Sequence, residues 1–260
     1  MKVALISHTP NPEQLVASAA KVCYSSLTPE EIIDRVEENE EQTAKYLDML
    51  VQLGHESPIE HISFTFCVSG VSRSLLAQLT RHRIASYSVR SQRYVSEKNF
   101  DVVVPPQIAE DPESLAIYEQ TIAACRDGYE KLAARMTQRI VEREGIDPEN
   151  KTAMAAASRK AAEDARFVLP NACETQMFFT MNARSLLNFF RHRCCSRAQW
   201  EIRDMAEQML ALVYPVAPHI FAQAGPACLK GRCPEGKMSC GKMKEMQQKY
   251  AQMKGGAEHE

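Results

Sequence analysis

The stretch Ile62-Ser63-Phe64-Thr65-Phe66-Cys67-Val68-Ser69-Gly70-Val71-Ser72 decides the fold. From Ile62 to Ser69, apolar residues alternate with small polar ones, which is the period of a strand with one buried face. Gly70 ends this pattern, and Ser72 is a residue type that caps helices. Helical spacing then continues through Leu75, Leu76 and Leu79 toward Arg83. This strand and the helix after it belong to a larger set of strands and helices that predicts an α+β fold.

The rest of the chain supplies more of both elements. Besides the strand near 60–69, strands are expected near 2–7, 101–104, 166–169 and 176–181, and together they predict a mixed or antiparallel central sheet. Long helices are expected to flank it. Thr28, Pro29 and Glu31 form a helix start with a capping box. The acidic helix that begins there is expected to continue to Gly54. The other helices are expected at 12–24, 112–144, 148–165, 183–193 and 196–214.

Composition narrows the class of protein. The chain has 260 residues, a net charge of -2 and 45% hydrophobic residues, as expected for one large globular domain or two small ones. The near-neutral charge argues against a protein that coats nucleic acid. No apolar run approaches the roughly 20 residues that span a bilayer. The early polar residues at the N-terminus and the odd number of cysteines, nine, predict a cytoplasmic protein with reduced thiols.

A basic segment begins at the end of the helix that is expected after Ser72. Residues 81–94, Arg-His-Arg-Ile-Ala-Ser-Tyr-Ser-Val-Arg-Ser-Gln-Arg-Tyr, contain four arginines and no carboxylate. Arginine suits bidentate binding of phosphate or carboxylate. Gln78 lies three residues before Arg81 on the expected helix, so both can face one ligand. The remainder, 86–94, is expected to be a loop. On charge alone, a solvated basic loop or a nucleic-acid patch explains the segment as well.

A second basic cluster lies near residue 190, and it contains Arg184, Arg191, His192, Arg193 and Arg197. Asn182 is expected to cap the helix that carries it. On that helix Arg193 shares a stripe with Leu186, Phe189 and Phe190. Because burying a charge is costly unless it is paired, Arg193 is a better site candidate than Arg191. Upstream, the segment His55–His61 is expected to be a polar ligand-binding loop rather than a metal site, since Pro58 makes it a turn.

The C-terminal segment contains Cys228, Cys233 and Cys240. Three interpretations stay open: a structural zinc site whose fourth ligand is Cys194, Cys195 or a histidine, redox-active or paired thiols, and an unliganded tail. Residues 242–260 are expected to fray.

Four elements in order resemble the flavin-dependent thymidylate synthases. The first is Arg81-His82-Arg83, seven residues and then Ser91-Gln92-Arg93-Tyr94, which looks like that family's signature. The second is His55-Glu56-Ser57-Pro58-Ile59-Glu60-His61. The other two are 165–170 (Ala-Arg-Phe-Val-Leu-Pro) and the block from Asn182 to Ile202. The resemblance covers residues 1–222, which are expected to form the catalytic domain, with 223–260 as a Cys-rich basic tail.

The resemblance implies an activity and a set of site residues. Family members convert dUMP to dTMP with FAD as hydride carrier, methylenetetrahydrofolate as carbon donor and NADPH as reductant, and they are homotetramers with shared sites. Arg193 is implied to be the catalytic residue. The residues implied to bind dUMP are Gln78, Arg81, Ser91, Gln92, Arg93, Arg166 and Arg193. Those implied to bind FAD are His55, Ser57, Arg81, His82, Arg83, Asn182, Arg184 and Asn188. No metal, nucleic-acid or membrane partner is implied.

Further features of the sequence bear on this resemblance. Ser91 can be a nucleophile or a ligand contact, and the absence of a general base at a readable spacing favours the contact. Ser88 and Val89 stand where many relatives have Asn-Glu. The alternative from another class is a nucleic-acid-binding protein that uses both arginine clusters and a metal-binding tail. The sequence has no G-x-G-x-x-G motif, which disfavours a Rossmann domain.

Overall fold

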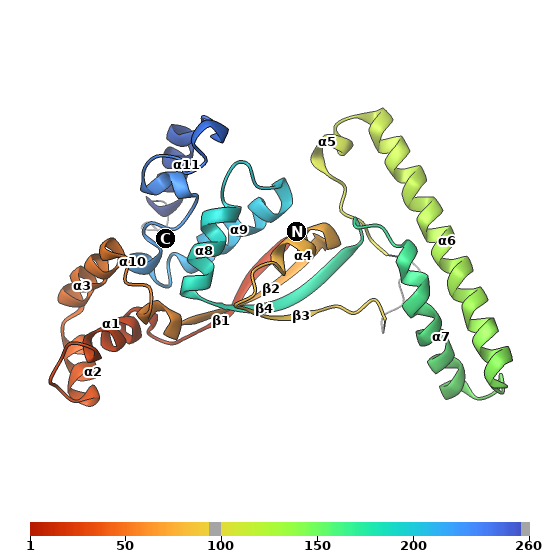
Figure 1. Ribbon diagram of the computed structural model, residues 1–260, viewed down its shortest axis with the longest axis horizontal. Coiled ribbons are helices and arrows are strands. Elements are labelled where there is room, and N and C mark those ends of the chain that lie inside the picture. Colours follow the sequence, from red (N-terminus) through yellow and green to blue (C-terminus); the bar gives the residue numbers. More distant parts are fainter. Residues whose placement is uncertain (94–99, 256–260) are drawn as a thin grey trace. The chain divides into compact units, whose positions relative to one another are not determined.

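The computed structural model of the protein describes residues 1–93 and 100–255. The chain divides into two compact units (Figure 1). Unit 1 comprises Met1–Val68, Gln78–Ser88 and the chain from Phe178 onward, and unit 2 comprises Ser69–Ala77 and Val89–Met177.

Four strands form one antiparallel sheet in the order β1-β2-β4-β3. They are β1 (Lys2–His8), β2 (Ser63–Ser72), β3 (Ser86–Val89) and β4 (Glu174–Asn182). The Ala183 N–H donates to the Ile62 carbonyl at 3.0 Å, and the Thr65 and Thr180 hydroxyls lie 2.9 Å apart. One residue number falls as the other rises, which fixes the antiparallel register of β2 and β4. The α+β prediction is confirmed.

The alternation predicted for β2 is also confirmed. Phe64, Phe66 and Val68 are fully buried, whereas the polar residues between them are half-exposed. Phe66 stacks on Phe179 of β4, with ring centroids 5.4 Å apart. Phe64 packs edge-on against Phe221, with centroids 5.4 Å apart. These aromatic pairs form the centre of the unit 1 core.

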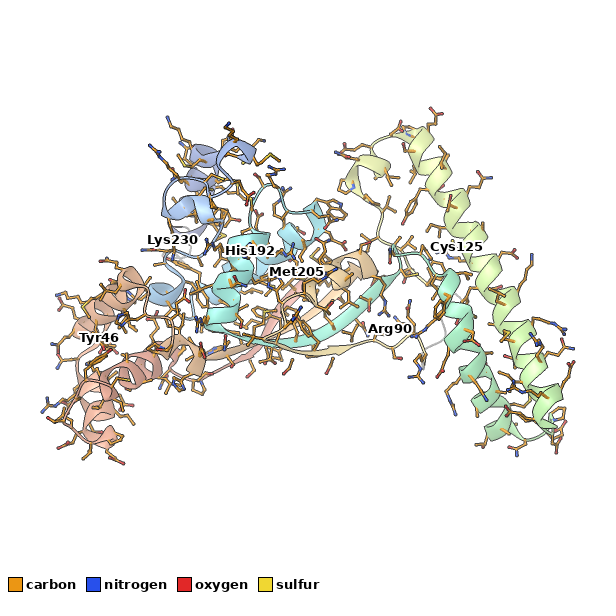
Figure 2. The ribbon with its side chains drawn as sticks, in the orientation of Figure 1. Tyr46, Arg90, Cys125, His192, Met205 and Lys230 are labelled. Atoms are coloured by element: carbon orange, nitrogen blue, oxygen red, sulfur yellow. The ribbon has the colours of Figure 1, made fainter. Side chains whose placement is uncertain are left out.

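Unit 1 surrounds this core with helices. At its N-terminal end lie α1 (Pro12–Val22), α2 (Pro29–Glu38) and α3 (Glu40–Leu53). Its C-terminal part contains α8 (Ala183–Arg193), α9 (Trp200–Val213), α10 (Pro218–Phe221) and α11 (Met243–Gly255). Met205 of α9 is fully buried inside this unit (Figure 2). Three 3-10 turns, at Pro58–His61, Ala227–Lys230 and Gly236–Met238, complete it.

Unit 2 is built around two helices that lie side by side (Figure 1). They are α6 (Pro112–Glu144) and α7 (Lys151–Ala165), preceded by the short helix α5 (Pro106–Ala109). Ile140 packs against Ala157 and Ala161 at their contact. The connecting helix α4 (Arg73–Leu79) begins in this unit. The small alanine side chains of α7 let the two helix backbones approach closely.

Local helix signals gave the most accurate predictions. The Thr28 hydroxyl accepts from the Glu31 N–H, and the Glu31 carboxylate accepts from the Thr28 N–H at 2.8 Å, which confirms the capping box. Gly145, at φ 59°, ends α6 in the left-handed conformation, as C-terminal glycines do. The Ser72 cap is confirmed, because its hydroxyl accepts from the Leu75 N–H at 3.1 Å.

Several element boundaries differ from the predictions. The helix after Ser72 ends at Leu79, so Arg81, His82 and Arg83 lie in the turn beyond it. The helix predicted from Thr28 to Gly54 is two helices, because Asn39 adopts a non-helical conformation between them. Helix α7 begins at Lys151 behind the cap of Asn150, and α9 begins at Trp200 behind Gln199. For α7 and α9, the polar side chain before the helix caps a start that lies later in the sequence than the predicted one.

Three strand predictions are wrong. Residues 86–89, predicted as loop, form β3, because this stretch pairs with β4, and the Arg90 N–H continues the contact to the Gln176 carbonyl at 3.0 Å. Arg166–Val168 is a 3-10 turn whose Phe167 is 82% exposed, so the apolar run before Pro170 is not a buried strand. The stretch 101–104 is not a strand either, and of its residues only Val102 pairs with another strand-like residue, Cys173. Pro105 and Pro106, which follow directly, lack the N–H groups that would extend this pairing.

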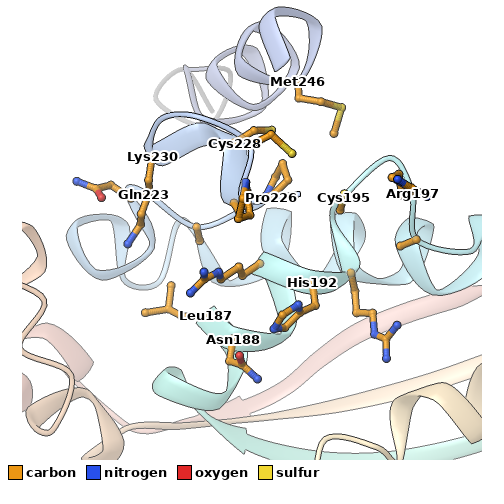
Figure 3. A pocket seen from close by; sticks show the side chains of 18 of the residues that line it. Leu187, Asn188, His192, Cys195, Arg197, Gln223, Pro226, Cys228, Lys230 and Met246 are labelled. Atoms are coloured by element: carbon orange, nitrogen blue, oxygen red, sulfur yellow. The ribbon is translucent and has the colours of Figure 1, made fainter. Parts of the chain in front are cut away.

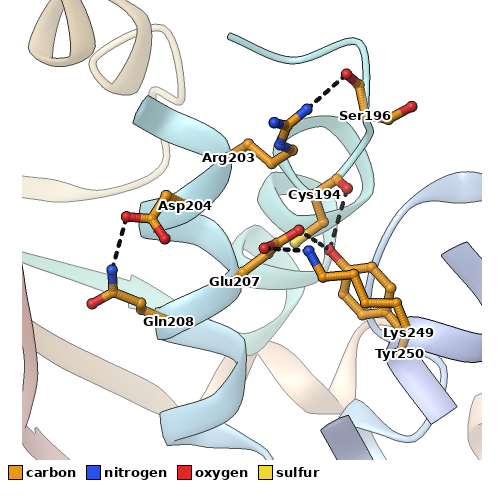
Figure 4. Close-up of polar contacts among 8 residues, drawn as sticks. All are labelled: Cys194, Ser196, Arg203, Asp204, Glu207, Gln208, Lys249 and Tyr250. Atoms are coloured by element: carbon orange, nitrogen blue, oxygen red, sulfur yellow. Dashed lines mark hydrogen bonds and ion pairs between the residues drawn. The ribbon is translucent and has the colours of Figure 1, made fainter. Parts of the chain in front are cut away.

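The C-terminal segment does not fray as predicted, up to the end of α11. Tyr250 is 1% exposed, and its hydroxyl contacts the Cys194 carbonyl at 3.2 Å and the Glu207 carboxylate at 3.1 Å (Figure 4). Lys249 forms an ion pair of 2.6 Å with the same glutamate. Met246 and Tyr250, one helical turn apart, are both buried. Their side chains anchor this helix to the rest of unit 1, and Tyr250 contacts Glu207 of α9. Residues 256–260 lie outside the described residues.

Candidate functional site: an arginine-lined cavity in unit 1

Helix α8 presents the second basic cluster to a cavity. The Asn182 side chain accepts from the Ser185 N–H at 2.8 Å and caps the helix, as predicted. Leu186, Phe189 and Phe190 are fully buried on one side. The opposite side is polar and exposed, and it lines the cavity through Arg184, Asn188, Arg191 and His192. The amphipathic pattern of this helix therefore fixes which of its residues can meet a ligand.

The turn after α4 is held in place from β3. The Tyr87 hydroxyl donates to the Leu79 carbonyl at 3.0 Å and to the His82 carbonyl at 2.8 Å. Burial raises the pKa of Tyr87 to about 12, so this hydroxyl stays a donor at neutral pH. The His82 ring packs edge-on against Phe189 of α8, with centroids 5.0 Å apart. Contacts from β3 and α8 thus hold the first half of the basic segment as a turn, although Arg81 and Arg83 are exposed.

Arg193 meets this turn with two donors. Its Nε donates to His82 Nε2 at 3.3 Å, and its Nη2 donates to the Gln78 backbone carbonyl at 3.4 Å. Burial, and next the Arg193 charge, lower the pKa of His82 to about 4, so the imidazole is a neutral acceptor at pH 7. Burial also lowers the pKa of Arg193. Within 1–93 and 100–255, Arg193 forms no ion pair with a carboxylate, so its positive charge is available to a ligand.

Arg184 is in a different state. Its Nε donates to the Glu56 carboxylate at 3.1 Å, and its Nη1 contacts the Glu60 carboxylate. These ion pairs, chiefly the one with Glu60, raise the pKa of Arg184 and connect α8 to the segment His55–His61. Because Arg184 is exposed, the pairs position the segment more than they stabilise the fold.

Together these residues line a cavity of about 1610 Å³. Seven arginines and one lysine face it, against three glutamates. The surplus of positive charge, in a chain of net charge -2, marks the cavity as a site for an anionic ligand. Its volume exceeds the usual range of about 300–1,000 Å³ for small-molecule pockets, so it can hold a dinucleotide-sized molecule or two smaller ligands.

The cavity brings together most of the residues predicted for one ligand. Arg81, His82, Arg83, Asn182, Arg184 and Asn188, all predicted for FAD, line it, and so does Arg193, which was predicted for dUMP. His55 lines a small neighbouring hollow instead, and Ser57 is the N-cap of the Pro58–His61 turn.

Unit 2 contains four of the other predicted residues, Ser91, Gln92, Arg93 and Arg166, whereas Gln78 belongs to unit 1. The Ser91 hydroxyl accepts from the Arg93 N–H at 3.1 Å. Arg93 Nε donates to the Glu163 carboxylate at 2.8 Å, and Arg166 Nε donates to the Glu163 carbonyl at 3.2 Å. Arg93 and Arg166 therefore meet at one residue of α7. Gln92 lies in the turn between Ser91 and Arg93, and Tyr94 lies outside the described residues.

The C-terminal segment lines the same cavity, which the sequence did not reveal. Lys230 and Arg232 add positive charge to the lining, as do Arg191 and Arg197 of the second cluster (Figure 3). The signal available in the sequence was the basic character of the stretch between Cys228 and Cys233, but that stretch was interpreted only through its cysteines.

Two other classes of site find no support in the described residues. In 1–93 and 100–255, no cluster of three or more histidine, cysteine, aspartate or glutamate side chains is arranged to hold a metal ion. None of the helices in this part of the chain is long and apolar enough to cross a membrane.

The fold and the cavity define a class: an α+β protein with an arginine-lined cavity that suits phosphorylated ligands, and with no glycine-rich dinucleotide motif in its sequence. The family model described as "Thymidylate synthase complementing protein" matches residues 4–219. The chain belongs to the family of flavin-dependent thymidylate synthases.

Two relatives and one solved structure illustrate the similarity. The flavin-dependent thymidylate synthase of Clostridium tetani is 52% identical over 96% of this chain and 97% of its own. The enzyme of Geobacter sulfurreducens is 45% identical over 97% of this chain and 99% of its own. A crystal structure of the Helicobacter pylori enzyme, complexed with FAD and dUMP, aligns with a TM-score of 0.57 over 86% of this chain and 100% of that one. At 22% identity, it supports the shared fold.

Proposed function

We propose that this protein is a flavin-dependent thymidylate synthase that reductively methylates dUMP to dTMP. Methylenetetrahydrofolate supplies the carbon and NADPH the reducing equivalents. The observation that carries the proposal is Arg193, a half-buried cation held by neutral partners in a cavity rich in arginine. Family membership favours this enzyme over the nucleic-acid-binding alternative.

The cavity fits FAD by size and charge. A volume of about 1610 Å³ accommodates a dinucleotide, and the arginines suit its pyrophosphate. Bound FAD supplies hydride transfer to the pyrimidine. We propose that Arg81, His82, Arg83, Asn182, Arg184 and Asn188 hold it, with His55 and Ser57 on the adjoining segment.

Arg193 has the catalytic role in this proposal. A cation at the edge of the pyrimidine formed by O4, N3 and O2 stabilises the negative charge that develops on the ring when C6 accepts hydride. His82 and the Gln78 carbonyl fix the direction of the guanidinium without neutralising it. The proposed dUMP contacts are Gln78, Arg81, Ser91, Gln92, Arg93 and Arg166, with Ser91 as a contact and not a nucleophile.

The assembly and location are also proposals. Homotetramer formation would explain why the proposed dUMP residues belong to both units, since a site shared between subunits can take residues from different copies. Residues 1–222 are proposed to form the catalytic domain and 223–260 an added segment, a division that the family match to 4–219 supports. The odd number of cysteines supports a cytoplasmic location.

The test compares two arginines on the same helix. Purified protein should absorb in the blue region as a flavoprotein, and it should oxidise NADPH faster when dUMP is present. R193A should lower kcat by about 100-fold or more, as loss of a charge-stabilising donor does. R191A, two residues away and exposed, should have a much smaller effect. Colourless protein that does not take up FAD, or R193A with unchanged turnover, contradicts the proposal.

A further inference from the structure

Four of the nine cysteines line the arginine-lined cavity. Cys195 lies between α8 and α9, and Cys228 lies in the C-terminal segment (Figure 3). Cys233 and Cys240 come from the same C-terminal segment. None of the roles proposed above uses them. Thiols from two distant stretches of sequence therefore meet at one wall of the cavity.

Cys228 is the centre of this group. It is 9% exposed, in the turn Ala227–Lys230, and its thiol interacts electrostatically with those of Cys195, Cys233 and Cys240. Its backbone carbonyl accepts from the Gln247 side chain at 3.2 Å, which connects the turn to α11. The position of Cys228 is therefore set by packing, and the other three thiols line the same cavity.

Cys240 is the exposed member of the group. Its segment is connected to the α8–α9 loop, because the Arg197 guanidinium donates to the carbonyl of Met238. Gly236 and Gly241 have positive φ, and a Cβ at either position would meet no atom within 4 Å. The segment from Cys228 to Cys240 contains only short 3-10 turns, so no long helix or strand holds these two thiols of the cavity lining apart.

The two thiols differ in reactivity. A hydrogen bond with Ser196, and next one with the Lys242 backbone, lower the pKa of Cys240. Burial raises the pKa of Cys228. A thiolate with a lowered pKa and free access reacts first with oxidants, and a neighbouring protonated thiol resolves the product. The described residues offer no ligand cluster that could hold a metal ion, which favours thiol chemistry over a zinc site.

We propose that Cys240 and Cys228 form a reversible dithiol–disulfide site on the cavity wall, oxidised by a peroxide. The Cys240 thiolate attacks one peroxide oxygen, the O–O bond breaks, and sulfenic acid and hydroxide form. The Cys228 thiol then attacks the Cys240 sulfur, the S–OH bond breaks, and water leaves. The disulfide closes a loop that contains Lys230 and Arg232, so its redox state constrains two cations of the cavity. This site does not depend on which ligand the cavity binds.

Peptide mapping tests the proposal on the full-length protein. Reduced protein receives one equivalent of hydrogen peroxide, and its free thiols are alkylated before digestion with trypsin. Cleavage after Lys230, Arg232, Lys237 and Lys242 separates the three C-terminal cysteines. The expected product joins the Cys228 and Cys240 peptides, and dithiothreitol removes it. C240S should abolish it, and because Cys240 is exposed this variant should fold normally.

C23S is the matched control, since Cys23 is an exposed cysteine outside the cavity, and the cross-link should persist in it. Three results would overturn the assignment. One is irreversible oxidation of Cys240 without a cross-link, and another is a disulfide from Cys195 or Cys233 instead. The third is stoichiometric zinc or iron in the purified protein that is lost in C228S. The assay measures thiols and not turnover, so its result is independent of the proposed enzyme activity.

Discussion

The Arg193–His82 contact depends on a histidine that stays neutral. His82 Nε2 accepts from Arg193, and protonation of the imidazole would replace this hydrogen bond with repulsion between two cations. The contact therefore makes the proposed catalytic arginine sensitive to pH through its neighbour. A neutral acceptor orients the guanidinium and leaves its charge free for the ligand.

We expect the fold to lose stability in acid through His82. Its pKa in the folded protein, about 4, lies below the ordinary histidine value of 6.5, so the unfolded chain binds the proton more readily between these values. The contribution of neutral His82 to the free energy of unfolding is fully present above pH 6.5, and it is lost as the pH falls toward 4. Because the side chain is only half-buried, we expect a loss of about 1–2 kcal/mol rather than the full free energy that corresponds to the pKa shift.

Urea unfolding at pH 4.5 and 7 measures this effect in the wild type and in H82Q. H82Q has no titrating group at this position, so it should lose about 1 kcal/mol less stability than the wild type between the two pH values. Equal losses in both proteins would show that His82 does not carry the pH dependence.

At the level of single residues, the sequence predicted part of the cavity. Arg193 was preferred over Arg191 because of its place on the apolar stripe of α8, and the structure confirms that it is the more buried of the two. Its partner His82 could not be paired with it, because the two are 111 residues apart and only the sheet brings them together. Lys230 and Arg232 were missed because their stretch was interpreted through its cysteines.

At the level of elements, the accuracy of the predictions follows how local each signal is. Caps such as Thr28, Asn182 and Gly145 act within a few residues, so the helix ends that they mark were predicted well. Strand β3 is short, and its stability depends on pairing with β4, some ninety residues later in the sequence. Non-local pairing of this kind has no counterpart in the local spacing of residues.

The cap of α8 separates a structural role from a binding role for Asn182. N182A removes the acceptor for the Ser185 N–H and should cost about 1 kcal/mol of stability. N182S keeps an oxygen acceptor and should unfold close to the wild type. Urea unfolding measures both. If Asn182 also holds FAD, both variants should bind FAD more weakly, whereas a purely structural residue would leave FAD affinity unchanged in N182S.

At the scale of the whole molecule, the C-terminal segment is part of unit 1 and of its cavity. Helix α11 packs through Met246 and Tyr250, and the turn before it supplies Lys230 and Arg232 to the lining. The Lys254 side chain donates to the carbonyls of Ala222 and Ala224, at 2.7 and 2.8 Å, and so joins the end of α11 to the start of the segment. The cavity wall therefore depends on this helix staying in place.

Tyr250 measures that dependence. Y250A removes a fully buried aromatic ring and should lower the free energy of unfolding by about 3–5 kcal/mol. Y250F keeps the ring but leaves the Glu207 carboxylate and the Cys194 carbonyl without the hydroxyl, and it should cost about 1–2 kcal/mol. Q252A, on the exposed side of the same helix, should change stability by less than about 0.5 kcal/mol. Urea unfolding followed by circular dichroism gives all three values. If α11 contributed nothing to the fold, Y250A would match Q252A, so the gap between these two variants measures how firmly the C-terminal wall is attached to the cavity.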